Sequence, residues 1–263
     1  MKRLAVLGYP VGHSRSPAMH NGALAELGLA DEWSYEAIEV APDELEQRVG
    51  EMPGEGFVGA NVTVPHKGAA LALADSLSET AREIGAANTL SFEAGEVRAD
   101  NTDARGLLDA LPESPGGKRA LVLGAGGAAR AAVWALVREG AEVAVWNRTP
   151  LRAEHLCAEL GGASVETPDQ ASYELIVNTS AAGLAGEDPF AELPLDRAGF
   201  APGQVVVDLV YGERPSPLLA AADVAGAATV DGIEVLVRQG ALSLRIWTGR
   251  EPSLEAMRAA ARR

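Results

Sequence analysis

The chain has 263 residues, of which 47% are hydrophobic and 5% aromatic, and it carries a formal net charge of −15. The negative charge argues against a nucleic-acid partner, because duplex binding needs clustered lysine and arginine. The one cysteine, Cys157, excludes an internal disulfide and a thiolate metal cluster.

Elements in the first hundred residues alternate between strand and helix. Short apolar runs predict buried strands at 4–8, 33–40 and 57–64. Ser16 as N-cap and Pro17 as first helical residue predict a helix that runs to about Gly28. Residues 87–100 are typical of a β-hairpin with an Ala-Gly turn. The alternation predicts a parallel or mixed sheet.

A Pro- and Gly-rich stretch at 111–118, after a helix near 103–111, predicts a linker or domain boundary. The length also suits two domains of ordinary size. After this stretch the pattern restarts, with predicted strands at 120–126, 142–147, 175–180, 205–211 and 227–232, and helices at 128–140, 233–247 and 253–262. Periodicity alone does not assign the last helix to either domain.

A glycine-rich turn between the first strand and the first helix of the second half fits the pattern G-x-G-x-x-A. It consists of Gly124, Ala125, Gly126, Gly127, Ala128 and Ala129. The first glycine permits the tight turn, the second lets a pyrophosphate approach the backbone, and the final alanine allows close packing of helix on strand. The complete strand–turn–helix–strand context favours dinucleotide binding over a purely structural turn.

The end of the next strand distinguishes NADP from NAD. An NAD enzyme usually has an acidic residue here for the ribose 2′-hydroxyl, whereas this chain has Asn147, Arg148 and Thr149, with Arg152 one turn later. A guanidinium can pair with a 2′-phosphate. We therefore predict NADP(H); the alternative is a surface arginine that follows a strand.

Polar residues cluster at three places in the first half, near His13–Pro17, near Asn61–Lys67, and where Ala87–Thr89 meets Asn101–Asp103. In open α/β sheets, ligands bind beyond the carboxyl ends of strands, so these clusters are expected to line one cleft. Ser14 and Ser16 lie beside a helix start, which suits a carboxylate, although Ser16 as a simple N-cap explains that residue equally well.

Lys67 is one of three lysines in a chain with 19 arginines. A lysine can exchange a proton, which arginine cannot do, and Asp103 is its expected partner. The alternative is an exposed lysine at a helix start. His13 and His66 have neither the spacing nor the acidic neighbour of a metal site, so we expect no metal.

The motifs GYPVGHSRSP, NVTVPHK, GAANTL, NTDARG, GAGGAAR, NRT, DLVYG and VRQGA occur in this order from residue 8 to 241. Together they resemble the shikimate dehydrogenase family, over nearly the whole chain. The resemblance implies reversible reduction of 3-dehydroshikimate to shikimate with NADPH, a step toward chorismate and the aromatic amino acids. It also implies that the last helices fold back onto the first domain.

The resemblance implies residue roles at matching positions. Lys67 would be the acid/base residue with Asp103 as partner. Substrate contacts would come from Ser14, Ser16, Thr63, Asn88, Asp103, Tyr211 and Gln239, the last from the second domain. The glycine turn and residues 147–152 would bind the rest of the cofactor, and Leu209 and Gly232 would lie near its nicotinamide.

We therefore expect an α/β fold: an N-terminal substrate domain with a mixed sheet, a Rossmann-type NADP-binding domain, and a cleft between them. The expected bounds are 1–102 completed by 240–263, and 103–239. No stretch approaches the roughly 18 apolar residues of a membrane span and no signal-peptide core is present, so we expect a cytoplasmic protein without a membrane partner. The sequence leaves the oligomeric state open, a homodimer included.

Three rival functions remain at this point. The nearest is a quinate/shikimate dehydrogenase that uses NAD, against which Asn147, Arg148 and Thr149 argue. A second is a regulator that binds NADPH without turnover, which would be expected to lack Lys67 or Asp103. A third is a reductase of another small polar acid, which the Ser14 and Ser16 pair makes less favourable.

Overall fold

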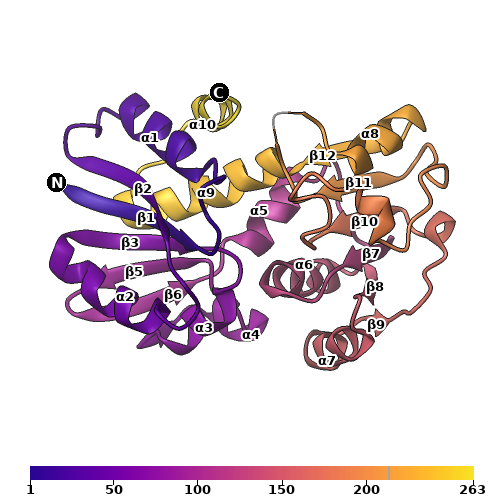
Figure 1. Ribbon diagram of the computed structural model, residues 1–263, viewed down its shortest axis with the longest axis horizontal. Helices are drawn as coiled ribbons and strands as arrows, with labels where there is room; N and C mark the ends of the chain where they lie inside the picture. The colour runs from indigo at the N-terminus through magenta and orange to yellow at the C-terminus, as the bar shows by residue number, and fades with distance from the viewer. Residues whose placement is uncertain (213) are drawn as a thin grey trace. The chain divides into compact units, whose positions relative to one another are not determined.

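The computed structural model describes residues 1–212 and 214–263. It divides into two compact units, Met1–Gly106 with Leu236–Arg263, and Leu107–Val235 (Figure 1). The chain passes from one unit to the other inside two helices, α5 (Asp103–Ala110) and α9 (Gly232–Thr248). The Pro- and Gly-rich stretch 111–118 is therefore not the boundary that its composition predicted, because Leu107 already packs into the core of the second unit.

The first unit has a mixed sheet of six strands in the order β2-β1-β3-β5-β6-β4. The strands are β1 (Lys2–Gly8), β2 (Trp33–Glu39), β3 (Phe57–Val62), β4 (Ser76–Leu77), β5 (Thr89–Glu93) and β6 (Glu96–Asp100). β5 runs antiparallel to both of its neighbours, and the expected hairpin turns at Ala94 and Gly95, both with positive φ. As a result, the carboxyl ends of β1, β3 and β6 lie at the same edge of the sheet as the start of β5.

Helices cover both faces of this sheet. The helical segments of the first unit are α1 (Ser16–Glu26), α2 (Leu45–Glu51), η1 (Met52–Glu55), α3 (Lys67–Ala72), α4 (Glu79–Ile84), the later part of α9, and α10 (Leu254–Ala261). Leu45, Val49 and Met52 pack with Ala70 of α3 against one face. On the other side α10 packs against α1. The last helices thus complete the first unit, as the family resemblance implied.

The second unit has a parallel sheet of six strands in the order β12-β11-β10-β7-β8-β9. The strands are β7 (Arg119–Leu123), β8 (Glu142–Trp146), β9 (Ala163–Ser164), β10 (Leu175–Asn178), β11 (Val205–Asp208) and β12 (Ala228–Asp231), and the helical segments are α6 (Gly127–Arg138), α7 (Pro150–Leu160), η2 (Gln170–Ser172), η3 (Pro189–Ala191) and α8 (Pro217–Val224). β11 ends three residues earlier than predicted, because the Asp208 carboxylate accepts the N–H of Val210 at 3.1 Å and turns the chain.

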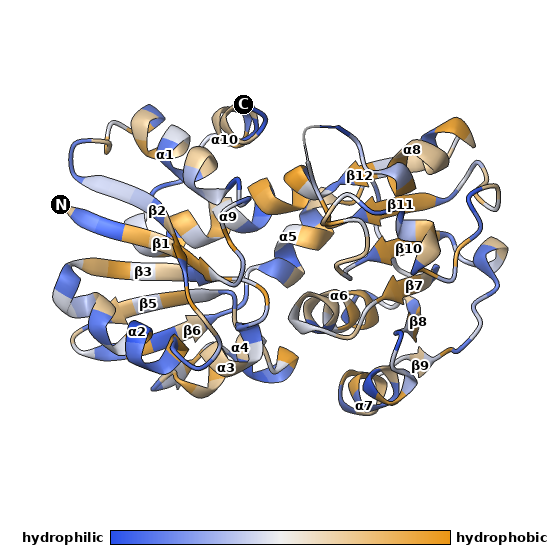
Figure 2. Cartoon of the chain, viewed as in Figure 1, coloured by the Kyte–Doolittle hydropathy of each residue, from blue (hydrophilic) through white to orange (hydrophobic). Residues whose placement is uncertain are grey.

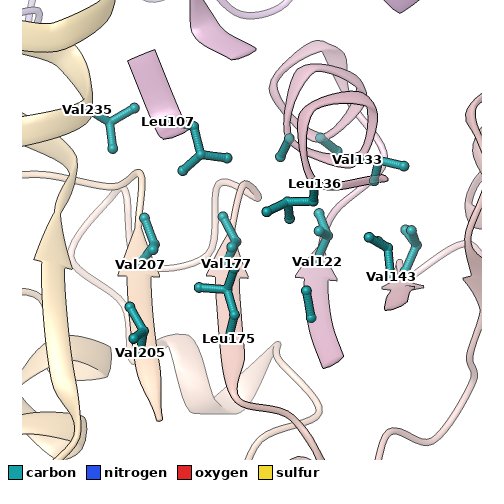
Figure 3. Packing of buried hydrophobic residues seen from close by; sticks show 14 of the residues in the cluster. Leu107, Val122, Val133, Leu136, Val143, Leu175, Val177, Val205, Val207 and Val235 are labelled. Atoms are coloured by element: carbon teal, nitrogen blue, oxygen red, sulfur yellow. The ribbon is translucent and has the colours of Figure 1, made fainter. Parts of the chain in front are cut away.

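Both faces of the parallel sheet are buried, which explains its continuous apolar strands (Figure 2). Val122 faces one cluster, shown in Figure 3 with Leu107, Val133, Leu136, Val143, Leu175, Val177, Val205, Val207 and Val235. Its neighbours Leu121 and Leu123 face the opposite cluster, which includes Leu218 and Leu219 of α8. Within the described residues, no helix is long and apolar enough to cross a membrane.

Candidate active site

The central feature of the first unit is a close pair formed by Lys67 and Asp103. Lys67 is the first residue of α3, just beyond β3, and Asp103 is the first residue of α5, just beyond β6. The Nζ atom of Lys67 donates to Oδ2 of Asp103 at 2.6 Å, with side chains that are 12% and 17% exposed. Partial burial limits screening of this pair by salt. The remaining exposure leaves the ammonium accessible to a small ligand.

Asn88 holds the second oxygen of this carboxylate. Its Oδ1 accepts the backbone N–H of Thr102 at 2.8 Å, and because a backbone amide can only donate, this contact fixes the orientation of the side-chain amide. The Nδ2 atom therefore faces Oδ1 of Asp103 and Oε1 of Gln239, each at 3.0 Å. Asn88 is 2% exposed, so it is a rigid support for the pair.

Gln239 belongs to the first unit, which corrects the expectation that it reaches the substrate from the nucleotide domain. Its helix, α9, enters the first unit at Leu236 and lies tightly against α5. A Cβ at Gly106 would be 2.7 Å from the Cβ of Gln239, so only glycine permits this approach. Asp103 likewise lies in the first unit, not in a nucleotide domain that begins at residue 103.

Ser14 and Ser16 lie beyond the carboxyl end of β1. The Oγ atom of Ser14 accepts the N–H of Ser16 at 3.3 Å, while the N-cap position is taken by Arg15 without a side-chain cap. The expectation that Ser16 is the N-cap is therefore wrong, because Ser16 already has helical conformation. Thr63 joins the same sheet edge, since its N–H donates to the carbonyl of Leu7 at 2.8 Å.

A buried polar network lies behind Asn88; three of its members belong to the polar clusters that the sequence indicated, and the fourth, Ser243, was missed. It consists of Asn61, Thr89, Thr102 and Ser243, all at most 5% exposed. Asn61 Nδ2 donates to Ser243 Oγ at 3.0 Å, and Ser243 Oγ lies 2.9 Å from Thr89 Oγ1 and 3.1 Å from Thr102 Oγ1. The one available signal was helical spacing, because Ser243 follows Gln239 by four residues.

Aromatic rings support the far end of this network. Tyr35 donates its hydroxyl to Oδ1 of Asn61 at 2.7 Å, and its ring stacks on His20 with centroids 4.1 Å apart. His20 is fully buried and neither ring nitrogen has a hydrogen-bond partner among the described residues. Burial, partly offset by the nearby Asn61, lowers the pKa of His20 to about 3. His66 is also buried, with Nε2 2.8 Å from the carbonyl oxygen of Val40.

The glycine turn in the second unit leaves open space beside the start of α6. Gly124 has a φ of 116°, and a Cβ there would lie 2.7 Å from Oγ1 of Thr179. Gly126 is the N-cap of α6 and lacks a side-chain cap, and a Cβ at Gly126 would meet no atom within 4 Å. Open space above uncapped N–H groups at a helix start is the arrangement that binds phosphate.

The polar residues that follow β8 lie at the same edge of the sheet as the glycine turn that follows β7, because the two strands are parallel neighbours. Asn147 Nδ2 donates to the carbonyl of Thr149 at 2.9 Å, which shapes the turn into α7. Arg148 is 82% exposed and its Nη1 lies 3.1 Å from Oε2 of Glu192. Arg152 is exposed in the first turn of α7. This turn therefore presents two cations at the end of the strand next to the glycine turn.

Leu209 and Gly232 are neighbours at the ends of β11 and β12. A Cβ at Gly232 would lie 2.6 Å from the carbonyl oxygen of Leu209, and the N–H of Leu209 donates to the carbonyl of Asn178 at 3.0 Å. Tyr211 lies in the loop that follows β11, also in the second unit. The structure thus brings Leu209 and Gly232 together beyond the strands of the nucleotide-type sheet.

A parallel sheet with a glycine turn, together with a mixed α/β unit that holds a lysine–carboxylate pair, defines a dinucleotide-dependent dehydrogenase class. Family models match in order: the shikimate dehydrogenase substrate binding domain over residues 6–90, shikimate/quinate 5-dehydrogenase over 109–180, and the shikimate 5′-dehydrogenase C-terminal domain over 232–262. The chain belongs to the shikimate dehydrogenase family.

Relatives and solved structures agree over the full length. Shikimate dehydrogenase (NADP(+)) of Methanocella arvoryzae is 44% identical, with 98% of this chain and 97% of the relative covered. The Brucella abortus enzyme of the same name is 42% identical, with coverage of 96% and 91%. The crystal structure of shikimate 5-dehydrogenase from Thermus thermophilus in complex with NADP(H) and shikimate has a TM-score of 0.90 at 44% identity, covering 100% of this chain and 99% of that chain.

Proposed function

We propose that this chain is an NADP-dependent shikimate dehydrogenase, which reversibly reduces 3-dehydroshikimate to shikimate in the pathway to chorismate and the aromatic amino acids. The observation that carries the proposal is the Lys67–Asp103 pair, with Nζ 2.6 Å from Oδ2 and with Asn88 on the other carboxylate oxygen. Full-length similarity to a structure that contains NADP(H) and shikimate supports it.

In this proposal the substrate is bound by polar side chains of the first unit. Ser14 and Ser16 hold its carboxylate beside the start of α1, where the helix dipole favours an anion. The ring oxygens are bound by Thr63, Asn88, Asp103 and Gln239, with Tyr211 as a further contact. Asn88 and Gln239 are 2% and 7% exposed and bonded to each other at 3.0 Å, so their amides are held in fixed orientations before a ligand binds.

Lys67 carries out the proton transfer. When bound, NADPH supplies the hydride that adds to the substrate carbonyl carbon. The ammonium of Lys67 donates a proton to the oxygen as its C=O bond becomes C–O⁻, which yields the hydroxyl and leaves a neutral amine that regains a proton from solvent. Asp103 holds the ammonium through Oδ2 and orients it toward that oxygen. In the reverse direction the amine accepts the hydroxyl proton.

The cofactor is bound by the second unit in this proposal. The pyrophosphate lies on Gly124, Ala125, Gly126, Gly127 and Ala128, where the uncapped start of α6 is open. The 2′-phosphate pairs with Arg148 and Arg152 and with the polar groups of Asn147 and Thr149. Leu209 and Gly232 lie beside the nicotinamide. We also propose a cytoplasmic location. The oligomeric state is open, and sedimentation velocity would distinguish a monomer from a homodimer.

The test is NADP⁺ reduction with shikimate, measured beside quinate and beside NAD⁺. The proposal requires kcat/KM to be highest for shikimate with NADP⁺. A preference for quinate with NAD⁺ would identify the broader quinate/shikimate activity instead. NADPH binding without turnover of either acid would identify a regulator that keeps the fold.

A further inference from the structure

We propose that Ser243 is a positioning residue for substrate binding, because its hydroxyl joins the helix that carries Gln239 to the strand ends that carry Asn88. The inference rests on the proposed function, in which Asn88 and Gln239 contact the substrate. Ser243 lies on the inner side of α9 and is completely buried. It does not touch the substrate itself, so its effect passes through its neighbours.

Four polar atoms from four parts of the first unit meet at the Ser243 hydroxyl. It accepts from Asn61 Nδ2 at 3.0 Å and donates to the carbonyl of Gln239 at 3.1 Å. The hydroxyls of Thr89 and Thr102 lie 2.9 Å and 3.1 Å away. A buried polar group with this many partners is costly to disturb, because the low dielectric strengthens each contact.

The contacts allow only a limited arrangement of protons, and that arrangement leads to Asn88. Tyr35 donates to Asn61, so the Asn61 amide nitrogen faces inward and donates to Ser243. The one proton of Thr89 goes either to Oδ1 of Asn88 at 3.0 Å or to Ser243 Oγ at 2.9 Å, and the Thr102 hydroxyl accepts from Nδ2 of Asn88 at 2.8 Å. The Ser243 proton goes to the Gln239 carbonyl, so Ser243 accepts from its other neighbours. The Thr102 proton has Ser243 Oγ at 3.1 Å, Oδ1 of Asn88 at 3.2 Å and Oε1 of Gln239 at 3.4 Å within reach.

Ser243 therefore bonds directly to the backbone of Gln239. Through Thr89 and Thr102 it is also connected to the side-chain oxygen and nitrogen of Asn88. Asn88 and Gln239 are also bonded directly, Nδ2 to Oε1, at 3.0 Å. Removal of the Ser243 hydroxyl is expected to make the side chains of both Asn88 and Gln239 less well ordered. Asn88 contacts Asp103 directly, and Lys67 only through Asp103. The affinity for substrate is therefore expected to change more than the rate of proton transfer.

α9 contains a matched control. Thr248 Oγ1 donates to the carbonyl of Leu244 at 2.7 Å, the same four-residue back-bond that Ser243 makes to Gln239. Thr248 otherwise accepts only the N–H of Arg250, at 3.1 Å, among the described residues. Thr248→Val thus removes a helix back-bond without touching the buried network.

The experiment compares Ser243→Ala, Thr248→Val and the wild type in steady-state NADP⁺ reduction. Ser243→Ala is expected to raise KM for shikimate about fivefold, the size of one net hydrogen bond, with KM for NADP⁺ and kcat each within about twofold. Thr248→Val is expected to leave all three constants unchanged. The Ser243→Ala variant should fold, because Asn61 keeps the carbonyl of Asn88 and the Thr89 hydroxyl as acceptors, at 3.1 and 3.2 Å.

A double-mutant cycle with Thr89→Val then tests the path. The two substitutions should be less than additive in KM for shikimate, because both interrupt the same connection to Asn88. Unchanged KM in Ser243→Ala, equal changes in Thr248→Val, or full additivity would each overturn the inference while shikimate turnover by the wild type still stands. A wild type without shikimate turnover would overturn the proposed function and this inference together.

Discussion

Lys67 and Asp103 are 36 residues apart in the chain, yet Nζ of the one lies 2.6 Å from Oδ2 of the other. Sheet topology produces this contact. β3 and β6 run in the same direction with the antiparallel β5 between them, so the residues that follow both strands emerge at one edge. Asn88, which precedes β5, reaches the same edge and holds Oδ1 of Asp103.

Lys67→Ala is expected to lower kcat by about 10²–10⁴, the usual contribution of general acid–base catalysis, with little change in KM for shikimate. The substitution removes the proton donor but leaves Asn88, Gln239 and the serines in place. Steady-state kinetics measures the effect, with Lys118→Ala as control, because Lys118 pairs with Glu113 in the second unit. A rise in KM at unchanged kcat would make Lys67 a binding residue and reject its proton-transfer role.

Arg148 is expected to determine the preference for NADP. Its guanidinium is 82% exposed and lies 3.1 Å from the carboxylate of Glu192, which competes with a 2′-phosphate. Arg148→Ala should lower the ratio of kcat/KM for NADP⁺ to kcat/KM for NAD⁺. Glu192→Gln should raise this ratio, but only by roughly twofold, because exposed ion pairs are weak. Added salt should reduce the difference between Glu192→Gln and the wild type. An unchanged ratio in Arg148→Ala would remove Arg148 from the phosphate site.

Much of the candidate site was predictable because its signals are local. Apolar runs mark the strands, the glycine turn has a fixed spacing, and polar residues directly follow strand ends. The rarity of lysine in this chain also made Lys67 conspicuous. These features depend on a few consecutive residues, so the sequence alone carries them.

The remainder depends on contacts between distant segments. Asn61 and Ser243 are separated by 182 residues, and no local pattern indicates that they meet. The expected bounds, 1–102 with 240–263 and 103–239, differ by four residues at each crossing from the observed units, which divide after Gly106 and before Leu236. The chain crosses inside α5 and α9, where composition gives no signal of a break. The six-residue helix α4 was not predicted, because tertiary packing rather than a long apolar period stabilises so short a segment.

His20 is expected to make the first unit sensitive to acid. Burial lowers its pKa from 6.5 to about 3, so between these values the unfolded chain takes up a proton that the folded chain excludes. The free energy of unfolding therefore falls as pH drops below about 6.5, by about 3 kcal/mol at pH 4.5 for this group. His20→Phe, which keeps a ring against Tyr35, should remove that part of the pH dependence.

Urea unfolding of the two proteins at several pH values between 4.5 and 7.5 measures this difference. His155→Gln serves as control, because His155 is exposed on α7. Parallel curves for the wild type and His20→Phe across this range would mean that His20 is protonated equally in both states.

Asp208 is expected to change the pH dependence of the free energy of unfolding in the direction opposite to His20. It is fully buried at the end of β11, and burial raises its pKa, against the hydrogen bonds from Ser216, Val210 and Asn178. The folded state therefore retains a proton that the unfolded carboxyl has lost, and stability from this group declines as pH rises through the folded pKa. Asp208→Asn, which keeps the shape without the charge, should gain stability relative to the wild type as pH increases.

Urea unfolding at pH 4, close to the ordinary pKa of an aspartate, and at pH 8 tests this prediction, with Asp223→Asn as an exposed control on α8. Asp208→Ala should lose about 3 kcal/mol or more at both values, because the N–H of Val210 (3.1 Å) and the amide of Asn178 (2.9 Å) lose their acceptor. A difference between Asp208→Asn and wild type that stays constant with pH would show that the buried carboxyl titrates as it does in the unfolded chain. A loss in Asp208→Asn that grows with pH would reverse the sign and make the charged form the stabilising one.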